Sequence, residues 1–397
     1  MTTRRLETWL ALAALSVGLL LLAMLGLWGY MSVTATPIHP DPDDIPSVAD
    51  AKPSPRWAAA VERARRIART GLAEQNLPGL SVAVGAGDEL VWAEGFGWAD
   101  LDSQVPVGPE TRFRIGTAST VLTSAAVGLL LEDGRLRLDE AIQTYVPEFP
   151  KKEWPVTLRH LMAHTSGLRN DGGDEGPLLS EHCERPVEAL RHFVHRPLLF
   201  EPGTRSHYSS YGWIVVSAAV EAAANEPFFA FVRSRVLEPL GMDDTIPDSA
   251  SERIPDRATS YFPRFAADPT YGLHLMRPVD HSCYAGASAF LSTPSDLVRF
   301  ALGIERGRLL QPDTVRLLQT AQRLASGEET GYGLGWDLET VTLDGKPARA
   351  VGHDGTLLGG MVASLLVLPD RDIVVAVVSN ISYADTVGLA GRIAEIW

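Results

Sequence analysis

The chain has 397 residues, of which 45% are hydrophobic, enough for one large domain or two medium ones. Its 49 acidic residues outnumber its 35 basic ones, and the formal net charge of −14 argues against a nucleic-acid-binding protein, because no basic stripe is present to neutralise phosphates. Arginine supplies most of the positive charge, and the only lysines are Lys52, Lys151, Lys152 and Lys346.

The first apolar stretch, residues 9–31, carries no charged residue and as a helix is long enough to cross a hydrocarbon core of roughly 30 Å. Arg4 and Arg5 precede it, so we predict a transmembrane anchor with residues 1–8 in the cytoplasm. The rest of the chain would lie on the periplasmic side of a bacterial inner membrane. The alternative is a signal peptide cleaved after the small residues at 33–35, which would release a secreted protein.

Residues 32–56 are rich in Pro and Asp, which predicts an extended linker between the membrane and a domain formed by residues 57–397. The domain opens with an amphipathic helix over residues 57–76. Two short apolar strands, residues 80–84 and 90–96, follow as a hairpin. The middle of the chain is mostly helical, with further helices expected at residues 156–163, 208–224 and 294–303.

The stretch 113–139 predicts a helix buried on all sides. Gly116 and a cluster of hydroxyl residues open it, an apolar run follows, and Gly134 marks its C-terminal cap. Thr117 and Thr120 are three residues apart and therefore share one face of the first turn. One interpretation is that these hydroxyls cap the helix amides, and the other is that they line a cleft above the helix.

Strand-like segments return near the C-terminus, before a final helix at residues 384–397. They lie at residues 331–338, 349–352, 361–368 and 373–379. Because strands occur towards both ends with helices between them, we predict an α+β fold. It has one antiparallel sheet, built from both chain ends and flanked by helices, with an inserted helical region.

Cys183 and Cys283 are the only cysteines. Outside the cytoplasm a bridge between them would close a loop of about 100 residues and stabilise the fold by about 4–5 kcal/mol. Two buried free thiols are the alternative.

The sequence lacks the motifs of two other enzyme classes. The Gly-x-Ser-x-Gly of α/β-hydrolases is absent. His160 and His164 have zinc-protease spacing, but Leu161 stands where the glutamate is needed, which favours structural histidines. We predict neither a metal nor a cofactor.

An ordered set of motifs runs along residues 57–397. It resembles the serine β-lactamase and penicillin-binding-protein superfamily, specifically the class C and mitochondrial β-lactamase-like branch. The motifs are LPGLSVAV (77–84), FRIGTAST (113–120), EDGRLRLD (132–139), LMAHTSGL (161–168), EPGTRSHYSSYGW (201–213), STPSDLVRF (292–300), GYGLGW (331–336) and GHDGT (352–356).

The resemblance implies a nucleophilic serine followed three residues later by an activating lysine. The corresponding residues here are Thr117 and Thr120, and the chain contains no Ser-x-x-Lys at all. Tyr208 matches the tyrosine that shuttles the proton, whereas Ser210 replaces an amide side chain that steadies the lysine and the substrate.

The third element of the family is present in its His-x-Gly form. His353 and Gly355 carry it, and the glycine is expected to let a substrate backbone lie against the strand. The backbone amides of Thr117 and Thr356 would form the oxyanion hole.

Two functions follow from this pattern. The first is a catalytically silent protein whose cleft binds a small molecule, a peptidoglycan-derived peptide or a partner. The second is a hydrolase of amide or ester bonds in which Thr117 attacks and Tyr208 or His353 is the base. Loss of the lysine favours the first, because nothing obvious lowers the pKa of Tyr208.

Overall fold

The computed structural model describes residues 2–50, 52–170, 175–343, 345–357 and 360–397. Within them, one antiparallel sheet forms the centre of the domain, in the order β1-β3-β2-β13-β12-β11-β10, with β4 paired to β3. The strands are β1 Ser47–Ala49, β2 Gly79–Ala86, β3 Glu89–Asp100, β4 Val105–Pro106, β10 Asp337–Leu343, β11 Lys346–Leu357, β12 Met361–Leu368 and β13 Ile373–Ser379.

The two ends of the chain meet at the centre of this sheet. Strand β13 pairs antiparallel with β2, and Val377 lies opposite Val82. Every residue of both strands is buried, as expected for strands covered on both faces. The predicted sheet built from both chain ends is therefore confirmed.

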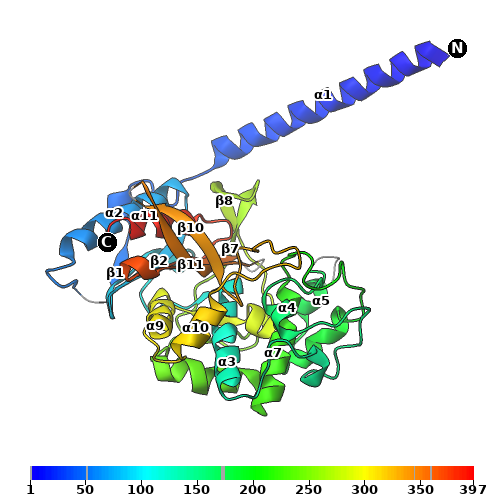
Figure 1. Cartoon of the computed structure of the whole chain (residues 1–397). Helices are drawn as coiled ribbons and strands as arrows, with labels where there is room; N and C mark the ends of the chain where they lie inside the picture. The colour runs from blue at the N-terminus through cyan, green and yellow to red at the C-terminus, as the bar shows by residue number, and fades with distance from the viewer. Residues whose placement is uncertain (1, 51, 171–174, 344, 358–359) are drawn as a thin grey trace.

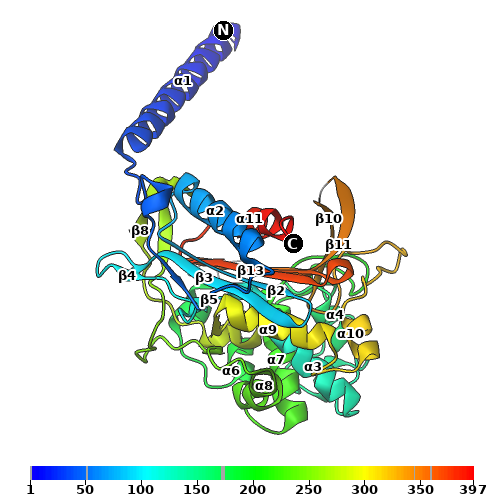
Figure 2. The same cartoon turned by 90° about the vertical axis from the view of Figure 1, so that its left-hand side faces the viewer.

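Helices cover both faces of the sheet (Figure 2). On one face lie α2 (Ala58–Glu74) and α11 (Thr386–Ala394), and on the other lies α9 (Pro294–Glu305) with the helical region below it. The buried stripe of α2 contains Val61, Ala64, Ala68 and Leu72, as its periodicity predicts.

The helical region is inserted between β4 and β10 and lies on one side of the sheet (Figure 1). Its helices are α3 Thr120–Glu132, α4 Leu158–Met162, α5 Glu175–Ser180, α6 Pro186–Ala189, α7 Ser210–Ala224, α8 Phe228–Val232 and α10 Pro312–Leu318. Short strands accompany them: β5 Phe113–Arg114, β6 Ile246–Pro247 and β9 Phe290–Ser292 form one small sheet, and β7 Tyr261–Phe265 and β8 Asp268–Leu275 form a hairpin.

Helix α3 is buried along most of its length, as predicted. A 3₁₀ turn, η2 (Gly116–Ser119), leads into it. At its other end, the amide of Gly134 donates to the carbonyl of Leu131 and the amide of Arg135 donates to that of Leu130. Gly134 has a φ of +67°, so the predicted glycine cap is present.

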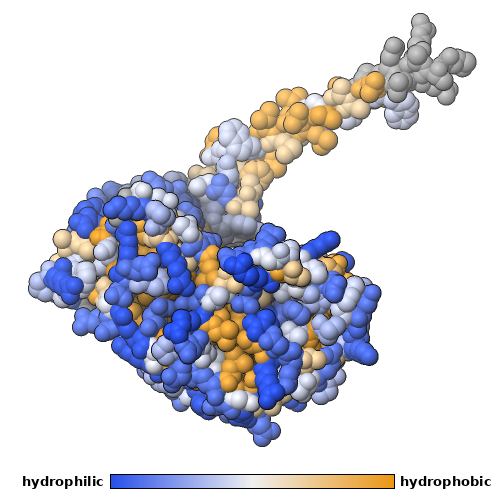
Figure 3. All heavy atoms as spheres, in the orientation of Figure 1, coloured by the Kyte–Doolittle hydropathy of each residue, from blue (hydrophilic) through white to orange (hydrophobic). Residues whose placement is uncertain are grey.

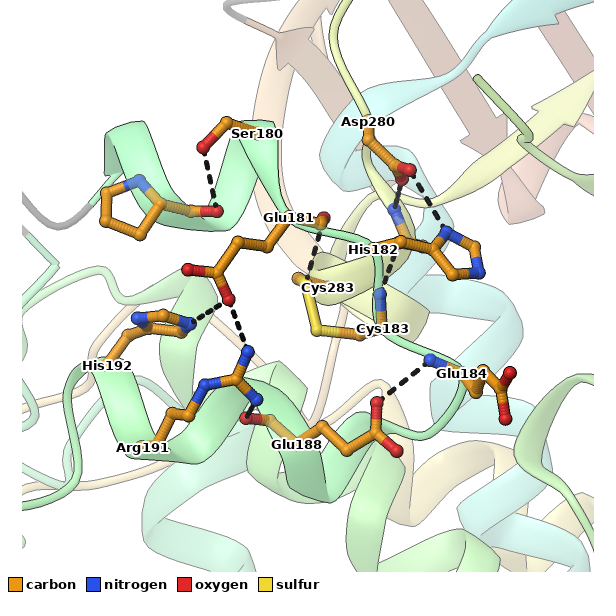
Figure 4. The surroundings of a disulfide bond; sticks show 12 residues. Ser180, Glu181, His182, Cys183, Glu184, Glu188, Arg191, His192, Asp280 and Cys283 are labelled. Atoms are coloured by element: carbon orange, nitrogen blue, oxygen red, sulfur yellow. Dashed lines mark hydrogen bonds and ion pairs between the residues drawn. A yellow bond between two sulfur atoms is a disulfide. The ribbon is translucent and has the colours of Figure 1, made fainter. Parts of the chain in front are cut away.

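A disulfide joins Cys183 to Cys283 (Figure 4). Cys283 lies in the 3₁₀ segment Ser282–Ala287, which packs against α7. The amide of Cys183 also donates to the hydroxyl of Ser282, at 2.9 Å. Of the two states left open by the sequence, the structure has the bridged one, and it ties the segment after α5 to the α7 side of the domain.

Helix α1 (Thr2–Thr34) projects away from the domain (Figure 1). Residues Leu12–Thr34 form a helix long and apolar enough to cross a membrane, slightly displaced from the predicted 9–31. Its described side chains are largely exposed and apolar, whereas the visible face of the domain is mostly hydrophilic (Figure 3).

The prediction of an extended linker is wrong for much of residues 32–56. The amide of Ile38 donates to Asn76, the side chain of Ile45 is 2% exposed, and β1 pairs with β3. Arg69 of α2 donates to the carbonyls of Pro42 and Ile45. The physical reason is that β3 offers an open edge, where even a Pro-rich segment can make backbone hydrogen bonds.

The predicted strand at residues 331–338 is also wrong over most of its length, because β10 begins only at Asp337. Gly331 and Gly335 have φ angles of +69° and +96°, which bend the chain here. A Cβ at Gly335 would lie 2.6 Å from the ring of Trp213, so this bend is packed directly on α7.

Candidate functional site

The site lies where η2, the end of β11, the turn before α7 and the bend before β10 come together. Turn η2 contacts both β11 and β12, which places the first turn of the α3 segment against the sheet. Thr117 is partly exposed there and 41% of the Tyr208 surface is open to solvent. The positions that the family resemblance assigns to catalysis are therefore gathered in one place.

Gly355 permits the close contact between β11 and η2. A Cβ at this position would lie 1.8 Å from the carbonyl oxygen of Ile115 and 3.0 Å from the amide nitrogen of Ala118. The chain's own η2 turn fills the space that a side chain would need, which differs from the predicted role of making room for a substrate backbone. The predicted oxyanion hole of the Thr117 and Thr356 amides stays a prediction, and the side chain of Thr356 is not among those described.

The hydroxyls of Thr117 and Thr120 do not cap the helix, so that interpretation is wrong. The Thr117 hydroxyl donates to the carbonyl oxygen of Asp354 on β11, at 3.0 Å. The Thr120 hydroxyl donates back to the carbonyl of Thr117, at 2.9 Å, a local bond that Ser and Thr often make in helices. Both side chains of the altered Ser-x-x-Lys motif are thus engaged with backbone oxygens.

Tyr208 stands beside Thr117. Burial of its hydroxyl raises the pKa of Tyr208 to about 12, and weaker hydrogen bonds to the side chains of Thr117 and Ser210 act in the opposite direction. The residue as a whole is nevertheless 41% exposed, so part of Tyr208 is open to solvent. At neutral pH this group is a phenol and not a phenolate.

His353 points into the site from β11 and is 3% exposed. Its Nδ1 lies 2.7 Å from the carbonyl oxygen of Asp354, which can only accept, so Nδ1 carries the hydrogen. Its Nε2 then accepts from the hydroxyl of Tyr332, at 2.9 Å. Both ring nitrogens of His353 therefore already have partners.

His164, given a structural role from its spacing, packs between two tyrosines of the site. Its ring centroid lies 4.2 Å from that of Tyr208 and 4.6 Å from that of Tyr332. Its Nδ1 accepts the amide hydrogen of Ser209, at 3.1 Å. Burial lowers the pKa of His164 to about 3, so the ring is neutral. The ring therefore packs and accepts a hydrogen bond beside Tyr208 and Tyr332.

Two residues of the site, Asn170 and Tyr332, were not predicted from the sequence. The side-chain oxygen of Asn170 accepts the amide hydrogen of Ser210 at 2.8 Å, so an amide side chain reaches the first turn of α7 from another loop. Tyr332 holds His353 from within the GYGLGW motif. That motif was visible in the sequence, but nothing in the local pattern indicated which of its residues faces the site.

Comparisons with known proteins identify the family of the chain. The model of the Beta-lactamase family matches residues 64–396. This protein belongs to the beta-lactamase family. The mitochondrial serine beta-lactamase-like protein LACTB of Bos taurus is 26% identical over 86% of this chain and 79% of its own length. Penicillin-binding protein 4* of Bacillus subtilis is 25% identical over 69% of this chain and 62% of its own.

Solved structures of the same fold include the D-amino acid amidase of Ochrobactrum anthropi SV3, with a TM-score of 0.73 and 23% identity over 85% of this chain and 98% of that one. FmtA of Staphylococcus aureus has a TM-score of 0.68 and 20% identity over 93% of this chain and 95% of that one. These likenesses confirm the predicted fold.

The lysine of the family motif has no counterpart in the described part of this site. Of the four lysines, Lys152 donates to the carbonyls of Val194 and Arg196, and Lys346 lies at the far end of β11, opposite Leu343. No lysine lies among the described residues of the site. The family's lysine position, one helical turn after Thr117, is occupied by Thr120, whose side chain is fully buried.

Proposed function

We propose that this protein is a membrane-anchored, extracytoplasmic member of the beta-lactamase family whose cleft binds a peptide ligand without hydrolysing it. The observation that carries the proposal is the hydrogen bond from the Thr117 hydroxyl to the carbonyl of Asp354. A nucleophile must pass its proton to a base as it attacks. Here that proton is directed at a backbone oxygen, which cannot remove it.

Neither candidate base supplies what is missing. The pKa of Tyr208 is raised to about 12 by burial, and no ammonium group lies beside it to oppose that rise. Both ring nitrogens of His353 are already engaged, because Nε2 bonds the hydroxyl of Tyr332 and Nδ1 donates to the carbonyl of Asp354. Loss of a nucleophile–base pair typically costs several orders of magnitude in rate.

Groups that could bind a peptide surround Thr117 and Thr120. The partly exposed Tyr208 and the closely packed backbones of η2 and β11 place an aromatic residue beside peptide groups. The names of a relative and of a structural neighbour mention penicillin and a D-amino acid amide, which supports an acyl-D-amino-acid peptide, as in cell walls, as the ligand. A peptide of this kind can pair its backbone with a strand edge.

Two features support the proposed membrane anchoring and the extracytoplasmic location of the domain. Residues Leu12–Thr34 form an exposed apolar helix of membrane-spanning length, and a disulfide joins Cys183 to Cys283. Disulfides persist mainly outside the reducing cytoplasm, which supports an extracytoplasmic domain. We place the domain on the periplasmic side of a bacterial inner membrane; relatives occur in bacteria, whereas the LACTB relatives are mitochondrial.

One observation favours the alternative function, hydrolysis by Thr117. The hydroxyl of Tyr208 is within hydrogen-bonding reach of Thr117, as a proton shuttle would need to be. The unlowered pKa of that tyrosine and the β-methyl of threonine both act against attack, so this alternative is the weaker one.

The test uses the full chain in detergent micelles with a fluorescent acyl-D-Ala-D-Ala peptide. We expect saturable binding by anisotropy and no release of D-alanine by mass spectrometry. Tyr208→Ala should weaken binding at least tenfold, whereas Tyr383→Ala, an exposed tyrosine that packs against Phe262, should not. Absence of binding would refute the proposal, and release of D-alanine that Thr117→Ala abolishes would establish the alternative.

A further inference from the structure

A second cavity, of about 350 Å³, lies between the loop around residues 250–260 and the end of β8 with the residues that follow it. Four arginines line it: Arg114 from β5, Arg253 and Arg257 from the loop, and Arg277 after β8. Such a concentration of one charge is unexpected in a chain with a formal net charge of −14.

Two of these guanidinium groups share one carboxylate behind the cavity. Arg114, which is 3% exposed, donates through Nε to Asp248 Oδ2 at 2.7 Å, and its Nη2 donates to the carbonyl of Val279 at 3.2 Å. Arg257 Nη1 lies 3.2 Å from the other oxygen of Asp248 and also donates to the carbonyl of Ser249, at 2.9 Å. These contacts fix two cations in place at the wall of the cavity.

The other two arginines are exposed, and neither Arg253 nor Arg277 has a carboxylate partner among the residues that the structure describes. The one acidic residue lining the cavity in the described part of the chain is Glu252. Four guanidinium groups against the carboxylates of Asp248 and Glu252 leave two positive charges uncompensated.

Two uncompensated positive charges match a phosphate monoester, which carries about −1.5 to −2 at neutral pH. Arginine is suited to this role, because its planar fork of N–H groups binds phosphate oxygens in pairs. We propose that this arginine cavity binds a phosphate group, separately from the cleft at Thr117. The buried Arg114–Asp248–Arg257 cluster forms the rigid wall, and Arg253 and Arg277 close on the ligand.

The position of the cavity suggests two sources for the phosphate. Leu275, the last residue of β8, and Met276 line the cavity beside Arg277, and β8 contacts α1. The indole of Trp28 donates to Tyr271 on β8, and Arg264 on β7 donates to the carbonyl of Met31 at the end of α1. In Figure 1 the β8 strand lies near the foot of α1. A phospholipid headgroup or a soluble phosphate ester could therefore supply the group.

The test is a titration of the full chain, in phosphatidylcholine nanodiscs, with glycerol 3-phosphate, followed by calorimetry. We expect saturable binding that weakens at least tenfold in the double variant Arg253→Ala, Arg277→Ala. Both side chains are exposed, so the variant should fold. The matched control, Arg137→Ala with Arg316→Ala, removes the same charge from exposed positions elsewhere and should bind as the wild type does.

A second arm uses nanodiscs that contain phosphatidic acid. If the headgroup is the source, the lipid should compete with glycerol 3-phosphate, and the competition should vanish in the double variant. Equal titrations in both kinds of nanodisc would assign the site to soluble phosphate esters. Absence of saturable binding in phosphatidylcholine nanodiscs, or equal binding by the wild type and the double variant, would overturn the proposal.

Discussion

The hydroxyl of Thr117 donates its hydrogen to the backbone carbonyl of Asp354, 3.0 Å away on the neighbouring strand. This bond connects the turn where the family has its nucleophile to the strand that carries His353. It stabilises the junction of η2 with β11 and directs the hydroxyl hydrogen at a backbone oxygen. The Thr120 hydroxyl likewise donates to a backbone oxygen, that of Thr117, so both threonines of the motif are held by backbone contacts.

Reintroducing the family's two side chains should restore some hydrolysis. In the double variant Thr117→Ser, Thr120→Lys, the serine has no methyl to restrict its rotation, and the ammonium group would oppose the burial that raises the pKa of Tyr208. We expect at least a tenfold gain over the wild type with a chromogenic β-lactam or p-nitrophenyl ester. Thr117→Ser alone should show no gain. A folded double variant without any gain would mean that the cleft has changed elsewhere as well.

Asp354 should make stability depend on pH. Burial raises its pKa from 3.8 to about 6 in the folded protein, so between these values the folded state binds a proton that the unfolded state does not. Its contribution to stability is therefore greatest below about pH 4 and falls as the pH rises towards and through 6, by at most about 3 kcal/mol at 1.36 kcal/mol per pKa unit.

Urea unfolding of the wild type and Asp354→Asn between pH 4 and 7.5 measures this effect. The difference between the two curves isolates Asp354, because His164, whose low pKa makes the folded protein lose stability as the pH falls below 6.5, is present in both. The asparagine variant should gain relative stability as the pH rises. Parallel curves for the wild type and Asp354→Asn would contradict the assignment.

Gly355→Ala should destabilise the domain by about 3 kcal/mol or more, because the added methyl would meet the carbonyl of Ile115 at 1.8 Å and backbone cannot move aside cheaply. Gly391→Ala on α11 is the matched control. A Cβ there meets nothing within 4 Å, so this substitution should be neutral or slightly stabilising. Chemical denaturation compares the two, and equal stabilities would mean that η2 does not pack on β11 as described.

Breaking the disulfide should cost about 2–5 kcal/mol of stability. Reduction of Cys183–Cys283 by dithiothreitol should lower the melting temperature of the wild type. The Cys183→Ser, Cys283→Ser variant should melt at the lower temperature whether or not the reductant is present. Two titratable thiols in the denatured, unreduced protein would show that the bridge does not form.

Features with a local pattern were predictable from the sequence. The apolar run of α3 with Gly134 after it, and the apolar strands β2 and β13, need only neighbouring residues to be recognised. The strand β1 was not predictable, because its pairing with β3 depends on a free sheet edge and not on its own composition.

The site was predictable in position but not in detail. The family motifs placed Thr117, Tyr208 and His353 together, but not their partners. Whether Thr117 donates to Asp354, or His353 accepts from Tyr332, depends on how β11 docks against η2 and the bend before β10. Both contacts join segments far apart in the chain, and no periodicity carries that information.

The most direct measurement is the intact mass of the full chain, in detergent, after incubation with a fluorophosphonate and separately with a penicillin. Thr117→Ala is the control. Because the Thr117 hydroxyl donates to the carbonyl of Asp354 and the pKa of Tyr208 is raised to about 12, we predict that folded protein gains no mass even at high reagent concentration. A stable adduct on the wild type that is absent from Thr117→Ala would show a working nucleophile and contradict the account of a cleft that binds without hydrolysis.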